Sequence, residues 1–298
     1  MFTEEKMNKE HGTPSEMNMT LVKEPLLSSG QFSHAELPPL LKQIYGGDYF
    51  FVPRMVSSSY VVSKEGIYSV KGYGPEVIAQ SSRADAFSLA LERVMADAIV
   101  VTSGTLNAEP ETTGWGYQTV FGYSHMKNLQ SVCKAMGDLR SSLGKSEYPP
   151  VYFMTNSGEV NSNALILSKG NSPVYVVTNE RRKEEKFPSG NLGRAKVLVF
   201  GDEVLDTSAF VQSLFQNNTF VRYEGGRKGL EVFLVNGLLG QLTITKMPVS
   251  PTVPLQNTEV GYIFKAGNFT LEEKIFSKRI SEKGEEITSL DLRGVTEI

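Results

Sequence analysis

Small and polar residues follow four short apolar runs of this sequence, directly at the point where each run ends. Two of them, around Gly104 and around Gly225-Gly226, have glycine where an anion would need a close approach to the backbone. When such a turn precedes a helix, the first helical amides can also donate hydrogen bonds to the anion. The spacing differs from the G-x-G-x-x-G fingerprint of common dinucleotide sites. The four turns are Thr102-Ser103-Gly104-Thr105, Thr178-Asn179, Gly201-Asp202-Glu203 and Glu224-Gly225-Gly226.

These turns need a sheet that gathers them, and the hydrophobic pattern predicts one. The run from 98 to 101 is continuously apolar, as in a strand buried on both faces, and follows a helical stripe over 85–97. Because strands alternate with helices, we expect a largely parallel α/β sheet whose strand carboxyl ends bring the turns to one edge. The other expected strands are 55–66, 174–177, 197–200, 220–223 and 242–245, and the other expected helices are 206–215 and 230–237.

The remaining segments set the domain organisation. Residues 1–35 are polar with little periodicity and predict a flexible N-terminal arm, whereas 36–298 predict a single domain. Within that domain, 114–150 reads as an inserted segment with an amphipathic helix over 126–143. Packing on its own core or across a dimer interface is favoured for this helix over an active-site lid. Segments 274–280 and 286–292 predict an antiparallel C-terminal hairpin, which makes the sheet mixed.

Composition narrows the possible partners. The net charge is -3 and the sequence pI is about 5.8, with acidic and basic residues interspersed. This argues against nucleic acid and favours a small molecule. A single cysteine, Cys133, and three histidines make a disulfide, a metal site or a Ser-His-Asp triad improbable. No signal-like apolar core and no run of roughly 18 to 20 apolar residues is present, so we expect a cytoplasmic protein without a membrane span.

At this level of detail the sequence resembles a known family. The stretch from Arg93 to Glu109 is similar to the segment "R, two residues, ADA, apolar strand, GxGT, then A and an acid" of riboflavin-pathway pyrimidine reductases. The stretch from Val221 to Gly226, with Gly237-Leu238 and Met247-Pro248 behind it, resembles the same family's "EGG, helix, GL, strand, P". Ser63 to Gly66 stands at the place of its "SxDG" turn. The resemblance spans roughly residues 40 to 250.

The resemblance implies a dihydrofolate reductase-like fold, a homodimer, and transfer of a hydride from NADPH to a ribosylamino-pyrimidine phosphate. No protein nucleophile and no metal is required, because the nicotinamide carries the chemistry. By position, the substrate would meet Glu65, Asn107 and Glu109. The cofactor would meet Ser103, Gly104, Thr105, Thr178, Asn179, Arg181, Glu224, Gly225 and Gly226. Arg181 and the following Arg182 could pair with the 2'-phosphate of NADPH, and a solvated loop explains them equally well.

Several positions depart from the family pattern. Thr102 replaces the first glycine of "GxGT", Glu65 replaces an aspartate, and Gly240-Gln241 replaces an Asp-Glu pair. The stretch 110–123 has no Arg or Lys to clamp a substrate phosphate. These departures leave a second interpretation open, a non-catalytic relative that serves as a nucleotide-binding or assembly module. Two further residues favour structural roles: Trp115 as a packing residue and Asp97 as a tie between a helix end and the sheet.

Overall fold

The computed structural model describes residues 55–63, 66–67, 83–123, 126–127, 129–216, 220–246, 275–280 and 286–291. The arm expected over 1–35 and the candidate substrate residue Glu65 lie outside the described residues. Among the described helices, none combines the length and the apolar composition needed to cross a membrane.

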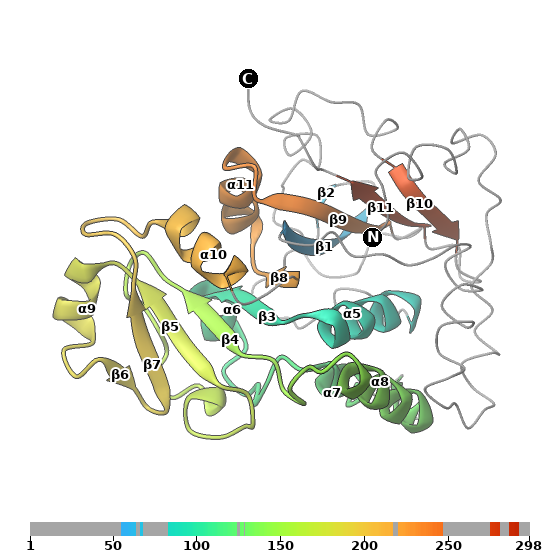
Figure 1. Ribbon diagram of the computed structural model, residues 1–298, viewed down its shortest axis with the longest axis horizontal. Coiled ribbons are helices and arrows are strands. Elements are labelled where there is room, and N and C mark those ends of the chain that lie inside the picture. The colour runs from blue at the N-terminus through green and yellow to red at the C-terminus, as the bar shows by residue number, and fades with distance from the viewer. Residues whose placement is uncertain are drawn as a thin grey trace.

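The strands form one mixed sheet (Figure 1). Their bounds are β1 (Met55–Ser63), β2 (Gly66–Ile67), β3 (Ala98–Thr102), β4 (Val151–Met154), β5 (Val174–Thr178), β6 (Asn191–Leu192), β7 (Ala195–Val199), β8 (Phe220–Glu224), β9 (Leu239–Lys246), β10 (Ile275–Ile280) and β11 (Glu286–Asp291). The order is β10-β11-β9-β1-β8-β3-β4-β5-β7-β6, with β2 paired to β1. From β9 to β7 all neighbours are parallel, and β2, β6 and the β10-β11 hairpin add antiparallel pairs. The predicted fold class, with its C-terminal hairpin, is confirmed.

The helices flank this sheet. Their bounds are α5 (Arg83–Met95), α6 (Ser103–Ala108), α7 (Tyr117–Val120), α8 (Gln130–Ser142), α9 (Glu180–Lys186), α10 (Thr207–Phe215) and α11 (Arg227–Val235), with a 3-10 turn, η4 (Leu165–Leu167). The sequence explains where α10 begins and where α11 ends. Asp206 caps α10, since its Oδ1 accepts a hydrogen bond from the Ala209 amide at 2.8 Å. Gly237, two residues beyond α11, has a φ of +63°, the left-handed conformation that ends helices.

The two faces of the sheet are covered differently. On one face, α10 and α11 bury Phe210, Leu230 and Phe233 against the sheet, together with Val100 and Tyr223. On the other face, Ile99 and Val101 of β3 join an apolar cluster over β4 and β5. The alternation along β3 is the period of two expected for a strand buried on both sides. The helical stripe of α5 forms a third cluster with α7 and α8, so these three helices make a separate layer (Figure 1).

The segment 114–150 contains α7 and α8 and connects β3 to its parallel neighbour β4. The apolar side of α8, including Val132 and Met136, packs in the same chain against Phe87 and Leu91 of α5. This is the first of the two packing arrangements that the sequence favours. β4 itself is a central strand that the hydrophobic pattern does not reveal, because it is only four residues long and directly follows two prolines.

Candidate functional site

The carboxyl ends of β8, β3, β4, β5 and β7 lie at one edge of the sheet, because these strands are mutually parallel. The two glycine turns are therefore neighbours. A Cβ atom added at Gly225 would lie only 2.9 Å from Cγ2 of Thr102, which ends β3. Thr178 and Asn179 stand two strands further along the same edge, behind β5. The edge therefore brings together the turns that the sequence singles out, as expected for an open α/β sheet.

The two glycines of the Glu224-Gly225-Gly226 turn have different surroundings. At Gly225 a Cβ would meet the Tyr223 hydroxyl at 2.3 Å as well as Thr102, so close packing alone requires glycine there. Gly226 is the N-cap of α11, and no described atom lies within 4 Å of a Cβ added at this position. The first amides of a helix have no partner within the helix, and its dipole favours an anion at this end. Gly226 thus offers an accessible helix N-terminus that packing does not explain.

The other glycine segment is built differently from the open turn that the sequence predicts. α6 begins directly at Ser103, so Gly104 and Thr105 belong to its first turn. Thr102 is the N-cap, and its Oγ1 accepts a hydrogen bond from the Thr105 amide at 3.4 Å. This gives the departure from "GxGT" a physical reason, because a threonine side chain caps the helix where the family pattern has glycine. Gly104 is exposed, and an added Cβ would make only an ordinary 3.8 Å contact with Thr102.

Thr178 and Asn179 are both fully buried. Asn179 caps α9, since its Oδ1 accepts from the Arg182 amide at 2.9 Å while its Nδ2 donates to Oδ1 of Asn156 at 3.3 Å. The Oγ1 of Thr178 has no hydrogen-bond partner among the described residues. Of these two expected cofactor contacts, Asn179 is engaged in the fold and Thr178 retains a hydroxyl that is unused among the described residues.

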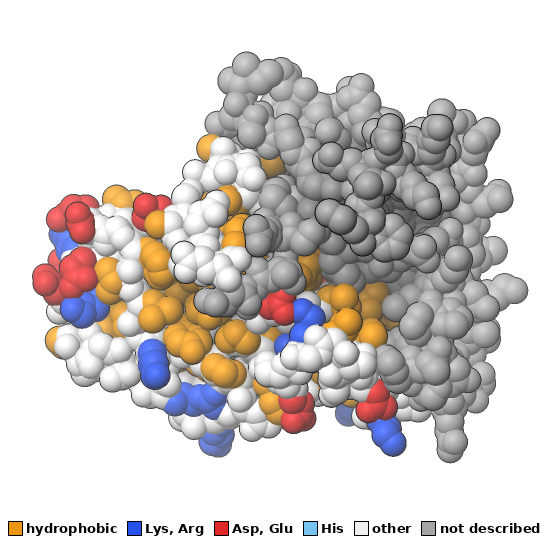
Figure 2. Space-filling view, viewed as in Figure 1, with side chains coloured by type: hydrophobic (Ala, Val, Ile, Leu, Met, Phe, Trp, Pro, Cys, Tyr) orange, Lys and Arg blue, Asp and Glu red, His pale blue; other side chains and the backbone are white. Residues whose placement is uncertain are grey.

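Arg181 and Arg182 lie in the first turn of α9 rather than in a loop, and this helix has no buried residue, in agreement with the solvated interpretation. Arg181 is about half exposed (52 %), and it donates to Glu185 at 2.9 Å and to Glu203 at 3.1 Å. Arg182 donates to Glu185 at 2.5 Å. Figure 2 shows acidic and basic side chains gathered at the α9 end of the molecule. A phosphate at this place would have to compete with these exposed carboxylates, whose ion pairs are individually weak.

The two described candidates for substrate contact differ in their availability. Asn107 is exposed and holds the loop after β4, since its Oδ1 accepts from the Asn161 amide at 2.7 Å and its Nδ2 donates to the Glu159 carbonyl at 3.3 Å. Glu109 follows α6 and is partly buried. Burial raises the pKa of this carboxyl, Arg93 lowers it and Glu224 raises it further, with a net rise. Glu109 is therefore electrostatically coupled to the ion pair described next.

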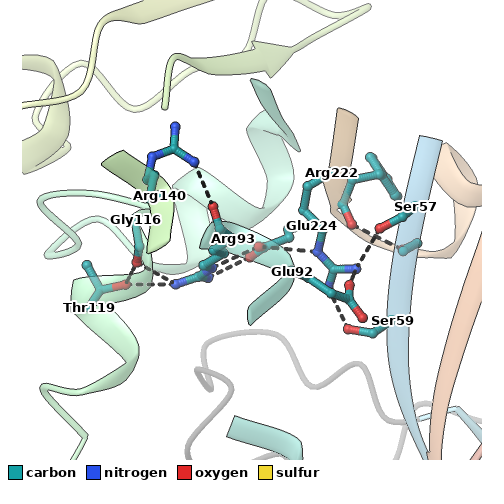
Figure 3. A network of polar contacts seen from close by, with 11 residues as sticks. Ser57, Ser59, Glu92, Arg93, Gly116, Thr119, Arg140, Arg222 and Glu224 are labelled. Carbon is teal, nitrogen blue, oxygen red and sulfur yellow. Dashed lines mark hydrogen bonds and ion pairs between the residues drawn. The ribbon is translucent and has the colours of Figure 1, made fainter. Parts of the chain in front are cut away.

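A network of buried charges lies beside the Glu224-Gly225-Gly226 turn, and the sequence analysis missed it (Figure 3). Arg93, from the last turn of α5, makes a bidentate pair with Glu224 at 2.8 and 2.5 Å, and their side chains are only 3 % and 10 % exposed. Its Nη1 also donates to Oγ1 of Thr119 at 2.7 Å and to the Gly116 carbonyl at 3.3 Å. Burial raises the pKa of Glu224, but the charges and hydrogen bonds of Arg93 and Arg222 outweigh it and hold that pKa below its ordinary value.

The network extends to side chains of β1. Arg222 of β8 pairs with Glu92 of α5, both 1 % exposed, and lies 3.5 Å from a carboxylate oxygen of Glu224. Its other donors reach Ser57 and Ser59. Among the described residues this network joins two arginines to two glutamates, so the charges of these four side chains balance. The sequence carries a signal for this network. Charged residues stand two positions apart in a buried strand, at 222 and 224, and next to each other in a helix with an apolar stripe, at 92 and 93.

Other expectations have clear outcomes. Trp115 is buried and packs edge-on against Phe153 at a centroid distance of 5.3 Å, which is a packing role. Asp97 accepts from the Phe220 amide at 2.9 Å and pairs with Lys145, so it ties the end of α5 to the sheet as predicted.

Gln241, at the departure from Asp-Glu, is buried, and both its side-chain amide atoms are unpaired among the described residues. The described part of the chain has no cluster of His, Cys, Asp or Glu that could hold a metal ion.

An open, mostly parallel sheet with glycine-containing helix starts at its carboxyl edge defines the class of α/β proteins that bind ligands at that edge. No protein-family model and no curated protein sequence matches this chain. Among solved structures it is similar to a pyrimidine reductase-like protein from Corynebacterium diphtheriae, with 15 % identity and a TM-score of 0.55 over 87 % of this chain and 98 % of the other.

Two further structures agree. The riboflavin biosynthesis reductase of Saccharomyces cerevisiae has 14 % identity and a TM-score of 0.50, over 86 % of this chain and 99 % of that one. The bifunctional diaminohydroxyphosphoribosylaminopyrimidine deaminase/5-amino-6-(5-phosphoribosylamino)uracil reductase of Thermotoga maritima has 14 % identity and a TM-score of 0.51. That match covers 80 % of this chain but only 56 % of the bifunctional protein. The chain therefore has the fold of the riboflavin-pathway pyrimidine reductases, as the sequence motifs predict.

Proposed function

We propose that this protein is an NADPH-dependent reductase that transfers a hydride to a ribosylamino-pyrimidine phosphate of riboflavin synthesis, or to a related pyrimidine or pterin-like substrate. The observation that carries the proposal is the accessible N-terminus of α11 at Gly226, next to the Thr102 end of β3, in a fold shared with pyrimidine reductases. Close contact with Tyr223 explains Gly225 and Gly229, whereas no described atom crowds Gly226, whose structural role among the described residues is the N-cap of α11.

The residues present fit a dinucleotide in part. Gly226 and the first amides of α11 would hold a phosphate, with Gly104 and Thr105 on the neighbouring turn, and the unpaired Thr178 hydroxyl would lie toward the adenosine end. When bound, NADPH supplies the hydride, and the protein supplies orientation and electrostatics. Glu109 would be the acidic side chain beside the substrate. Burial raises the pKa of its carboxyl, which favours the protonated form that can donate a proton.

The binding site is tested with Gly226→Val. The branched side chain has room among the described residues, yet it would stand where a phosphate must approach the backbone, so NADPH affinity should fall by at least tenfold. Calorimetric titration measures this effect. Val235→Ala, at the exposed far end of α11, is the matched control and should bind as the unmodified protein does. Unchanged affinity in a folded Gly226→Val protein would remove the site.

The alternative, a non-catalytic nucleotide-binding relative, is favoured by one observation. The buried amide of Gln241 has no partner among the described residues at a position where the family pattern has an acid. Both functions allow NADPH binding, so binding does not separate them. A screen of pyrimidine and pterin substrates for substrate-dependent NADPH oxidation does, because only a reductase consumes the cofactor.

We also propose that the reductase is a homodimer, as its resemblance implies, and that it works in the cytoplasm. Because the apolar side of α8 packs against α5 and α7 of the same chain, we expect the dimer contact to use another surface.

A further inference from the structure

Arg93 reaches two segments that are far apart in the sequence. Its Nε and Nη2 hold the carboxylate of Glu224, the residue directly before the Gly225-Gly226 turn. Its Nη1 holds the Gly116 carbonyl and the Thr119 hydroxyl, which open α7. The guanidinium therefore uses all three nitrogens, and it joins the end of β8 to the crossover between β3 and β4 (Figure 3).

The end of α5, which carries Arg93, is itself held in place by hydrogen bonds. A second buried arginine, Arg140 of α8, donates to the carbonyls of Arg93, Val94 and Ala96 at 3.3, 2.6 and 2.7 Å. These are the last carbonyls of α5 and its C-terminal continuation, which a cation stabilises. Arg140 thus anchors the helix end, while the Arg93 side chain points away from it to the turn.

The planar fork of Arg93 determines where the Glu224 carboxylate lies. Bidentate pairing fixes both oxygens, whereas the other cation near this group, Arg222, approaches it only at 3.5 Å. Glu224 ends β8 and immediately precedes the glycine turn, so the ion pair with Arg93 holds the side chain next to the start of α11. Trp115, the only tryptophan of the chain, is covalently next to Gly116 and is buried, so it reports on the other segment that Arg93 holds.

We propose that Arg93 is a positioning residue that couples the 116–119 segment to the Glu224-Gly225-Gly226 turn, so that an anion bound at the turn is sensed at Trp115. The ligand part of this proposal rests on the proposed function. The coupling itself depends only on the contacts of Arg93 in the protein without ligand.

The experiment compares Arg93→Lys with Arg140→Lys. Lysine keeps the positive charge in both variants but has no planar fork, so it cannot hold a carboxylate bidentately and two further acceptors in fixed directions. Both residues are buried arginines at the same helix end, and only Arg93 contacts Glu224. The measurements are the thermal midpoint, hydrogen exchange of the amides over 226–229, the NADP⁺ dissociation constant, and Trp115 fluorescence during titration. NADP⁺ is chosen because it does not absorb tryptophan emission.

Arg93→Lys should accelerate exchange over 226–229, weaken NADP⁺ by about tenfold, within the usual range of coupling between sites, and abolish the Trp115 response to ligand. Arg140→Lys should lower the thermal midpoint and leave the other three measurements as in the unmodified protein. Equal effects of the two variants on exchange and affinity would show that Arg93 is merely structural and overturn the proposal. If the unmodified protein does not bind NADP⁺, the proposed function fails, and the exchange comparison alone then decides the coupling.

Discussion

Glu224 is a carboxylate that the fold keeps charged in a buried place, and this has a consequence for acid stability. Its pKa in the folded protein is below the ordinary value of 4.5, because Arg93 and Arg222 outweigh burial. A depressed folded pKa contributes stability that is present above the unfolded pKa and is lost as pH falls through the folded pKa. The unmodified protein should therefore lose this contribution below about pH 4.5.

Glu224→Gln tests this at the level of one residue. The variant keeps the shape of the side chain but cannot titrate, so the difference in unfolding free energy between pH 7 and pH 4 should be smaller than in the unmodified protein. Its stability at pH 7 should also fall, because Arg93 loses its buried partner. Urea unfolding at several pH values measures both effects. An identical pH dependence in the two proteins would mean that other carboxylates carry the acid sensitivity.

The same residues show why the candidate site was only partly predictable. Glycines behind apolar runs are visible in a sequence, so Gly104, Gly225 and Gly226 were found. The bidentate pair of Arg93 and Glu224 joins residues 131 positions apart, and no local pattern reports such a contact. Even for a residue that was found, the sequence cannot separate a glycine required by a neighbouring tyrosine, Gly225, from one that faces open space, Gly226.

Among the helices and strands, α10 has an N-cap that can be tested separately from any function. The Asp206 side chain accepts from the Ala209 amide, and α10 buries Phe210, Val211 and Leu214 against the sheet. Asp206→Ala should cost about 1 kcal/mol of unfolding free energy, the usual value of an N-cap. Asp206→Asn, which keeps an accepting oxygen, should restore most of it. Chemical denaturation of the three proteins decides the point, and equal stability of the alanine and asparagine variants would rule out a capping role.

Elements with strong periodicity were predicted closely, and the others were not. The predicted helical stripe of α5 and the predicted apolar run of β3 are both present in the structure, because burial on defined faces requires apolar residues at these positions. β4 has only four residues, too few to show a period, and α9 is a charged seven-residue helix without a buried residue, so it leaves no periodic trace. Its cap, Asn179, was the available signal, but it was interpreted as a ligand contact.

For the whole molecule, the testable property is its assembly state. The chain has a mass of 32.9 kDa, and the proposed homodimer should sediment with twice that mass at tens of micromolar protein. Leu143→Asp, at the exposed end of α8, should leave the dimer intact, because the apolar side of this helix is already covered within the chain. A species of monomer mass at that concentration would exclude the dimer. Dissociation of the dimer by Leu143→Asp would show that α8 contributes to the dimer interface.

The place of β1 in the sheet has a consequence for synthesis on the ribosome. This strand is the first in the described part of the chain, yet it lies between β8 and β9, and Arg222 reaches back across 165 positions to Ser57. Until residues 220–246 have left the exit tunnel, β1 and β3 both lack a partner that they have in the finished sheet, and Glu92 lacks its ion pair with Arg222. Contacts this distant in sequence slow folding and leave strand edges exposed to other chains meanwhile. Between the emergence of β3 and that of β8, the nascent chain therefore exposes strand edges of β1 and β3 that the finished sheet covers.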